Sequence, residues 1–172
     1  MNEASLGRLL VFRVGNLACA AEVDQVREIL PRLPTTRIPG APPVVAGLVN
    51  VRGTLVTVVE GWRALGQSPP SPTPTPALPA GSSQDNGGGE RQGSTIILDL
   101  GKVREGEEGH RLVGFTVDEV TDMLAAGDAQ LEDRRGLAGV DPTLVRAVGR
   151  RGEGQIFVVL DVAALLGPIL TT

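Results

Sequence analysis

The residues of this chain best suited to recognition chemistry are Arg52 and Gly53, which interrupt the apolar stretch GLVNVRGTLVTVVE at 47–60. Arg-Gly between two apolar runs indicates the turn of a β-hairpin, since glycine accepts positive φ. A guanidinium has five N–H donors and can bind a carboxylate or a carbonyl edge through two hydrogen bonds. The stretch therefore fits either a recognition arginine held on a rigid hairpin or an ordinary solvated turn.

Other side chains that could carry chemistry are few and scattered. His110 is the single histidine and lies in the polar sequence EEGHR, and Cys19 is the single cysteine and lies in an apolar run. One cysteine forms no internal disulfide and no cysteine-based zinc site, and one histidine limits the chain to a single Ser-His-Asp arrangement. We therefore expect no enzymatic activity and no metal or other cofactor. Cys19 is expected to be a small buried side chain and His110 a solvated loop residue.

The composition limits the kind of fold that positions these residues. The 172 residues include 23 Gly, 13 Pro and 2% aromatic residues, which favours many short elements around a core of aliphatic side chains. The net charge of −4 and the pI of about 5.0 argue against a nucleic-acid-binding surface. No apolar run has the length of a membrane span, and the first residues lack a signal-peptide pattern. We expect a cytoplasmic protein with no direct membrane insertion.

One segment differs from the rest in composition. Residues 68–93 read SPPSPTPTPALPAGSSQDNGGGERQG, in which Leu78 is the single large aliphatic side chain. Such a segment buries too little apolar area to offset the entropy lost on ordering. We expect a disordered Pro/Gly/Ser-rich insertion at 68–93, acting as a spacer rather than as a proline-motif ligand. It would separate a first lobe at approximately 1–67 from a second lobe at approximately 94–172.

Apolar runs on both sides of this insertion indicate β-strands. They are LLVFRV (9–14), LACAA (17–21), LVNV (48–51), TLVTVV (54–59), TIILDL (95–100), RLVGFTV (111–117), LVRAVG (144–149) and QIFVVL (155–160). VDQVREIL at 23–30 has the spacing of a short helix or of a helix-to-strand passage, and DVAALL at 161–166 that of a short helix. Many short strands at close spacing are typical of small β-barrels.

The two halves of the chain also resemble each other. TLVTVVEGWRALG at 54–66 and QIFVVLDVAALLG at 155–167 share an apolar run, an acidic residue, a helix-like run and a final Leu-Gly. The acids, Glu60 and Asp161, fall where a helix N-cap or first helical turn is expected, which suits their charge. The pattern favours a duplicated small β-barrel, and a groove between two barrels is a place where a partner can bind.

Several motifs of this chain resemble those of the CheW family and occur in the same order as they do in that family. Together they cover essentially the whole chain outside the insertion. The stretch at 47–60 resembles the central signature of the family, and FRVGNLACAAEVDQVREI (12–29) its first hairpin and V-x-x-V-x-E-I segment. VGFTVDEVTDML (113–124) resembles its G-x-x-V-D-x-V segment, and VRAVGRRGEGQIFVVLDVAALL its last hairpin and helix. The resemblance implies a mainly β fold, a single domain over 1–172 with two five-stranded SH3-like β-barrels side by side and a few short helices.

The same resemblance implies a function and a set of partner-binding residues. It implies a non-catalytic adaptor that joins a CheA-type histidine kinase, through the kinase's own CheW-like regulatory domain, to the cytoplasmic tip of chemoreceptors. Arg52 resembles the family's receptor-interaction arginine, and Glu28 resembles the glutamate that pairs with it. The other positions that the resemblance associates with partner binding or with the turn are Val26, Gly47, Asn50, Val51 and Gly53.

The sequence also departs from the family pattern. Thr57 and Glu60-Gly61 stand where many members have Pro and Asp-Leu, and the insertion at 68–93 is not typical of a minimal member. These departures motivate an alternative function, a divergent CheW-like scaffold in a pilus, gliding or other pathway that localises or sequesters a partner without forming a receptor–kinase complex. Recruitment to membrane-associated receptor arrays is expected of the adaptor and not of this alternative.

Overall fold

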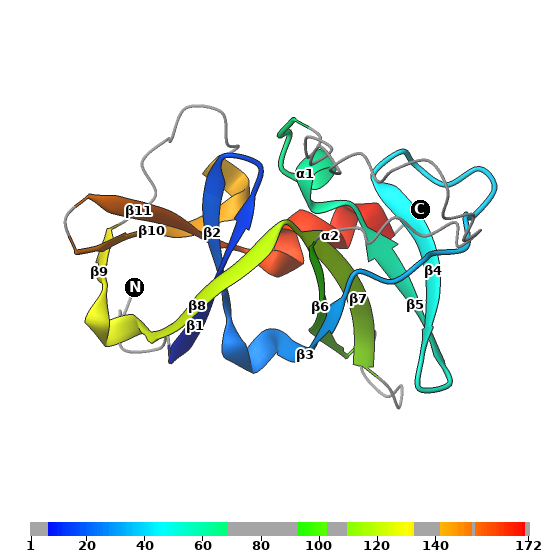
Figure 1. Ribbon diagram of the computed structural model, residues 1–172, viewed down its shortest axis with the longest axis horizontal. Coiled ribbons are helices and arrows are strands. Elements are labelled where there is room, and N and C mark those ends of the chain that lie inside the picture. Colours follow the sequence, from blue (N-terminus) through cyan, green and yellow to red (C-terminus); the bar gives the residue numbers. More distant parts are fainter. Residues whose placement is uncertain (1–6, 69–92, 103–109, 133–141, 153, 171–172) are drawn as a thin grey trace, which may run out of the picture.

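The described strands form two sheets that lie side by side along the longest axis of the molecule (Figure 1). The computed structural model describes residues 7–68, 93–102, 110–132, 142–152 and 154–170, so the predicted insertion lies outside them apart from its two ends. The first sheet, called here the β2 barrel, has the spatial order β8 (Glu119–Ala125), β1 (Arg8–Val14), β2 (Leu17–Glu22), β11 (Gln155–Leu160), β10 (Val145–Arg151) and β9 (Gln130–Glu132). The second, the β7 barrel, has the order β3 (Val26–Pro31), β6 (Ser94–Lys102), β7 (His110–Val117), β5 (Thr54–Val59) and β4 (Val45–Val51).

The predicted mainly β architecture is therefore confirmed, with β9 as a sixth strand of one sheet. Short helical elements lie where the chain enters or leaves strands: 3₁₀ turns at Val23–Gln25, Ala126–Asp128 and Pro142–Leu144, and helices α1 (Gly61–Ala64) and α2 (Val162–Leu170). The passage predicted for 23–30 is confirmed, because a 3₁₀ turn leads directly into β3. No helix of the described residues is long and apolar enough to cross a membrane.

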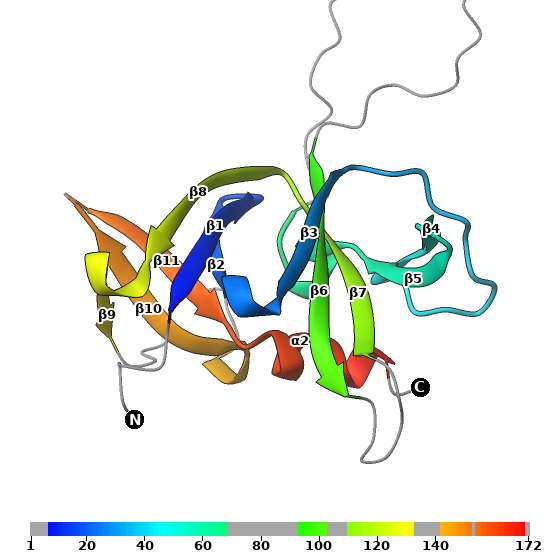
Figure 2. The same ribbon diagram turned by 90° about the horizontal axis from the view of Figure 1, so that it is seen from below.

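Each half of the chain contributes strands to both barrels. β2 pairs in parallel with β11, where Cys19 lies opposite Val158, and β7 pairs in parallel with β5, where Val113 lies opposite Thr57. Figure 2 shows β8 crossing from β7 to the edge of the other sheet beside β1. The lobes expected at 1–67 and 94–172 therefore do not coincide with the two sheets. Parallel pairing between distant segments leaves no local signal in the sequence.

Both barrels repeat one strand order. The order β8-β1-β2-β11-β10 matches β3-β6-β7-β5-β4 when β1 is equated with β6, β2 with β7, β3 with β8, β4 with β10 and β5 with β11. The registers agree as well, since Val49 lies opposite Val56 in one barrel and Gly149 opposite Phe157 in the other. This equivalence aligns VDQVREIL (23–30) with VDEVTDML (117–124), a second internal repeat that supports a duplication of the whole half.

The largest apolar cluster lies between the barrels rather than inside either one. It combines buried side chains of both sheets with α2, and it includes Phe12 and Phe115, whose rings meet edge to face with centroids 6.0 Å apart. Smaller clusters fill the β2 barrel around Phe157 and the β7 barrel around Val56. Because the largest cluster is shared, its burial stabilises both barrels together and joins them into one unit.

Cys19 belongs to this shared core and is fully buried. Burial raises the pKa of its thiol to about 12, because the thiolate would lose its hydration. We expect Cys19 to resist a thiol-specific colorimetric reagent in the native protein at mildly alkaline pH and to react completely after denaturation. The measurement is the rate of reagent release with and without denaturant, and rapid reaction of the native protein would contradict the buried position.

Candidate partner-binding site

Arg52 and Gly53 form the turn between β4 and β5, with φ angles of +51° and +85°. Two left-handed residues are what a tight two-residue hairpin turn requires. Within the described residues Arg52 is the only non-glycine residue with positive φ. That conformation costs a non-glycine residue about 1–2 kcal/mol, and the equivalent turn between β10 and β11 has Gly152 and Gly154 in positive φ instead. Glycine would adopt this backbone conformation without strain. The presence of arginine instead indicates that its side chain has a role at this position.

Glu28 on β3 orients the guanidinium of Arg52. Nη2 of Arg52 donates to Oε1 of Glu28 at 2.6 Å, with side-chain exposures of 81% for Arg52 and 22% for Glu28. An ion pair this open to solvent adds about 0–1 kcal/mol to stability. Its main effect is therefore to restrict the direction of the guanidinium. The other N–H groups of Arg52 make no hydrogen bond within the described residues and are available to a partner.

The neighbours of Arg52 stiffen the turn. Oδ1 of Asn50 accepts a hydrogen bond from the backbone N–H of Gly53 at 2.8 Å. Val51 is half-buried and packs against the apolar cluster inside the β7 barrel. Asn50, Val51 and Gly53 thus fix the backbone from which Arg52 projects.

Gly47 and Val26 lie on the scaffold beside this turn. Gly47 on β4 has φ +153°, and a Cβ there would collide with the carbonyl oxygen of Thr36. Thr36 approaches closely because it forms a two-hydrogen-bond bridge with Leu48, each bond 2.8 Å long. Val26, at the start of β3, is half-buried against the shared core. The structure therefore gathers Arg52, Glu28, Asn50 and Gly53 at one turn, whereas Gly47 and Val26 support the strands behind it.

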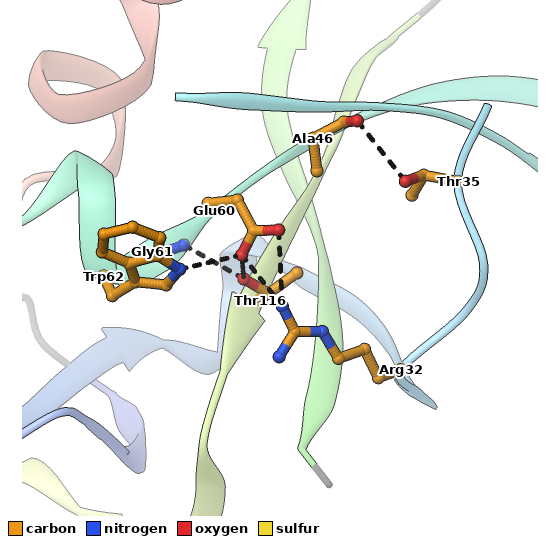
Figure 3. A network of polar contacts seen from close by, with 7 residues as sticks. All are labelled: Arg32, Thr35, Ala46, Glu60, Gly61, Trp62 and Thr116. Atoms are coloured by element: carbon orange, nitrogen blue, oxygen red, sulfur yellow. Dashed lines mark hydrogen bonds and ion pairs between the residues drawn. The ribbon is translucent and has the colours of Figure 1, made fainter. Parts of the chain in front are cut away.

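A half-buried polar network joins the segment that follows β3 to the end of β5 (Figure 3). Nη2 of Arg32 donates to both carboxylate oxygens of Glu60, at 3.0 and 3.3 Å, and the two side chains are 15% and 18% exposed. The same carboxylate accepts from Nε1 of Trp62 and from Oγ1 of Thr116, each at 3.2 Å. Glu60 does precede α1, as predicted, but its carboxylate serves this network and does not cap the helix.

The Arg32–Glu60 network and the Arg52–Glu28 pair lie at the same place in the fold, where the two edge strands of the β7 barrel meet. β3 and β4 are the two edge strands of the β7 barrel. Arg52–Glu28 and Arg32–Glu60 both connect β3 or its continuation to the β4–β5 hairpin. The more buried Arg32–Glu60 pair therefore holds in place the two elements that carry Glu28 and Arg52.

Gly61, one of the departures from the family pattern, is explained by packing. It is buried at the start of α1, where a Cβ would overlap the carbonyl oxygen of Thr116 and press on the ring of Phe115. The hydroxyl of Thr116 also accepts a hydrogen bond from the N–H of Gly61 at 3.1 Å. Glycine at this position allows α1 to lie directly against β7.

The structure adds an apolar component that sequence analysis missed. Among the described residues, the exposed large apolar side chains are Ile29, Leu55, Met123 and Ile156, with relative exposures of 41%, 68%, 50% and 44%. Leu55 lies opposite Asn50 in the hairpin, and Ile29 follows Glu28 on β3. A signal for Leu55 was present, because buried Val56 and Val58 alternate with it on β5 and place it on the outer face.

His110 differs from its prediction as a loop residue. It begins β7, where Nδ1 lies 2.9 Å from Oδ2 of Asp99, and its side chain is half exposed. Burial raises the pKa of Asp99, but hydrogen bonds from the Gly101 N–H and from His110 outweigh this and hold its pKa below the ordinary value. The described residues contain no group of three or more metal-ligating side chains.

The fold and this turn define a two-barrel β-protein that presents an exposed arginine, in a left-handed backbone conformation, at the end of a hairpin. The family model for the CheW-like domain matches residues 8–168, and the chain therefore belongs to that family. Its fold matches the crystal structure of scaffolding protein TtCheW from Thermoanaerobacter tengcongensis, with a TM-score of 0.70 over 93% of this chain and 87% of that one. The sequences are 16% identical, and the match confirms the predicted pair of SH3-like barrels.

Curated relatives are chemotaxis proteins. The chain is 27% identical over 124 residues to the chemotaxis protein CheW of Rhizobium meliloti, covering 72% of this chain and 64% of that protein. It is 26% identical over 120 residues to the probable chemotaxis protein CheW of Rhizobium etli, covering 70% and 61%. For the chemotaxis protein CheW of Klebsiella aerogenes the identity is 25% over 158 residues, covering 91% and 80%. The matches thus span less than two thirds of the length of the two Rhizobium proteins.

Proposed function

We propose that this protein is a non-catalytic, cytoplasmic adaptor of a chemosensory system. In this role it couples the cytoplasmic tip of chemoreceptors to a CheA-type histidine kinase, bound through the kinase's CheW-like regulatory domain, and is recruited with them to membrane-associated arrays. Family membership and the chemotaxis relatives support the pathway. The single observation that carries the binding role is Arg52, exposed in a strained turn and oriented by Glu28.

The geometry of the turn favours binding without a large entropic cost. Asn50 and Gly53 hold the backbone, and Glu28 restricts the guanidinium before any partner arrives. A preorganised donor loses less freedom on binding than a mobile one. Leu55 lies on the hairpin that carries Arg52, and Ile29 lies on the strand that carries Glu28, and both side chains are exposed. An amphipathic helical hairpin can cover a surface that combines charged and apolar groups in this way. We therefore assign the receptor tip, rather than a small molecule, to this end of the β7 barrel.

Arg52→Gly is expected to weaken partner binding without lowering the thermal stability of the protein. Glycine relieves about 1 kcal/mol of backbone strain at φ +51° and loses an exposed ion pair worth a similar amount or less, so the melting temperature should stay the same or rise slightly. Loss of the guanidinium at the centre of an interface should weaken partner binding by roughly 10–100-fold. Thermal unfolding measures the first effect, and co-sedimentation with receptor and kinase cytoplasmic fragments measures the second.

The matched control is Arg8→Ala, which removes an exposed arginine from the other barrel and should leave binding unchanged. A large fall in melting temperature for Arg52→Gly would mark Arg52 as a structural residue. Absence of any ternary complex with wild-type protein, when all three components are folded, would overturn the adaptor role and leave the scaffold alternative.

A further inference from the structure

The strand β3 contains a β-bulge at Arg27, immediately before Glu28. Val26 lies opposite Leu98 of β6, and Glu28 lies opposite Ile97. Because Leu98 and Ile97 are adjacent in the chain, Arg27 is an extra residue with no counterpart on β6. In a regular strand, residues two positions apart point to the same face of the sheet. The extra residue therefore places Val26 and Glu28 on opposite faces.

The two faces of β3 lead to different parts of the molecule. Leu98 belongs to the apolar core that both barrels share, and Val26 packs against that core. Ile97, the residue opposite Glu28, belongs to the smaller cluster inside the β7 barrel. On this second face the carboxylate of Glu28 comes within 2.6 Å of Nη2 of Arg52. A regular strand would turn Glu28 toward the face that Val26 occupies, so the pairing of Glu28 with Arg52 depends on the bulge.

The internal repeat has the same bulge in β8. Val120 lies opposite Phe12 of β1, and Asp122 lies opposite Val11, so Thr121 is the extra residue. Val120 packs against the shared core, whereas Val11 belongs to the cluster inside the β2 barrel. Each half of the chain thus sends one residue into the shared core and turns an acidic residue, two positions later, to the opposite face. A bulge that recurs in both halves is a built feature of the fold.

Different side chains hold the two bulges. In β8 the hydroxyl of Thr121 donates a hydrogen bond of 3.1 Å to the carbonyl oxygen of Val11, where the register shifts. In β3 the bulge residue is Arg27, and its Nε lies 3.8 Å from Oδ2 of Asp99. Asp99 directly follows Leu98, the last residue of β6 before the shift. Each contact therefore joins the bulge residue to the neighbouring strand beside the register shift.

Asp99 is itself held by contacts within β6 and with β7. Its carboxylate accepts a hydrogen bond from the backbone N–H of Gly101 at 2.8 Å and lies 2.9 Å from Nδ1 of His110. The side chain of Asp99 is 16% exposed, whereas that of Arg27 is 57% exposed. The carboxylate is therefore the fixed member of the pair, and the position of the Arg27 guanidinium depends on it.

We propose that Asp99 is a positioning residue for the Arg52 site. Asp99 holds Arg27 in the bulge, and the bulge keeps Glu28 turned toward the β4–β5 hairpin. Glu28 in turn orients the guanidinium of Arg52. Asp99 acts through these two intervening residues rather than by contact with a partner. The inference rests on the proposed function for its effect on receptor binding, but the orientation of Arg52 can be measured without a partner.

A rescue taken from the internal repeat tests this role. Asp99→Ala and Arg27→Ala each remove the contact, and each should weaken binding of a receptor cytoplasmic fragment by about 3–10-fold. Asp99→Ala combined with Arg27→Thr gives β3 the bulge residue of β8, whose hydroxyl can donate to the carbonyl oxygen of Ile97. Binding by this double variant should return to within about twofold of wild type.

The rescue distinguishes positioning from a general loss of structure. The double variant does not restore the contacts of Asp99 with Gly101 and His110, so recovered binding identifies the bulge as the cause. Far-UV circular dichroism and thermal unfolding establish that each variant is folded. A folded double variant that binds no better than Asp99→Ala would overturn the proposal.

The guanidinium of Arg52 gives a readout that needs no partner. Its Nε–Hε cross-peak in a ¹H–¹⁵N NMR spectrum is assigned by its absence from Arg52→Gly. Asp99→Ala and Arg27→Ala should shift this cross-peak in the same direction as Glu28→Gln does, and the double variant should return it. A cross-peak unchanged in both single variants would overturn the proposal even if binding falls. If the wild type binds no receptor fragment, the proposed function fails, while this spectrum still decides the role of Asp99.

Discussion

Glu60→Ala is expected to lower the free energy of unfolding by about 2–4 kcal/mol, since it leaves the half-buried guanidinium of Arg32 without its counter-ion. Arg32 is 15% exposed, and both of its hydrogen bonds to Glu60 would disappear. Nε1 of Trp62 and the hydroxyl of Thr116 would lose their acceptor at the same time. Urea denaturation followed by far-UV circular dichroism measures the change.

The double variant Arg32→Ala with Glu60→Ala is the control for this result. It removes the stranded charge as well as its partner, so it should be less destabilised than the sum of the two single variants. Binding to the proposed partners should fall in Glu60→Ala, because β3 and the β4–β5 hairpin lose the contact that holds them together. A loss below about 1 kcal/mol would show that water replaces the carboxylate and that the network adds little to stability.

Gly149→Val is expected to destabilise the protein by about 2–3 kcal/mol through overpacking in the β2 barrel. A Cβ at Gly149 would overlap the ring of Phe157, which is 3% exposed. The β7 barrel has Val49 and Val56 at the equivalent positions. One barrel therefore combines a small with a large residue where the other combines two residues of medium size.

This comparison predicts a rescue. Phe157→Val alone should cost about 2–3 kcal/mol by leaving a cavity, whereas Gly149→Val with Phe157→Val should be more stable than either single variant. The melting temperatures of the three variants provide the measurement. Additive losses in the double variant would mean that the two barrels do not share one packing scheme.

Local features of this fold were predictable because local residues determine them. The Arg52-Gly53 turn, the strands on either side of it and the passage at 23–30 depend on neighbours in the chain. Glu60 and Asp161 were placed correctly before their helices, and Asp161 caps α2 by accepting from the N–H of Ala164 at 3.1 Å. The family resemblance then supplied the pairing of Arg52 with Glu28, which no spacing rule contains.

Features that depend on distant contacts were not predictable in the same way. Arg32 meets Glu60 only because the edge strands of one barrel close on each other. Arg151 meets Asp122 because β8 crosses to the other sheet. The repeat of VDQVREIL (23–30) in VDEVTDML (117–124) was visible in the sequence, but its helix-like spacing conceals that both segments contain a strand.

The exchange of strands between the halves has a consequence for the ancestry of the protein. Each half places its first two strands in one barrel and its later strands in the other. A half-chain alone therefore completes no barrel, and it can do so only by trading strands with an identical copy. A strand-swapped homodimer of half-length chains would have this topology, and gene duplication with fusion of the two chains would preserve it. In the sequence, the junction between the two halves would fall between α1 and β6.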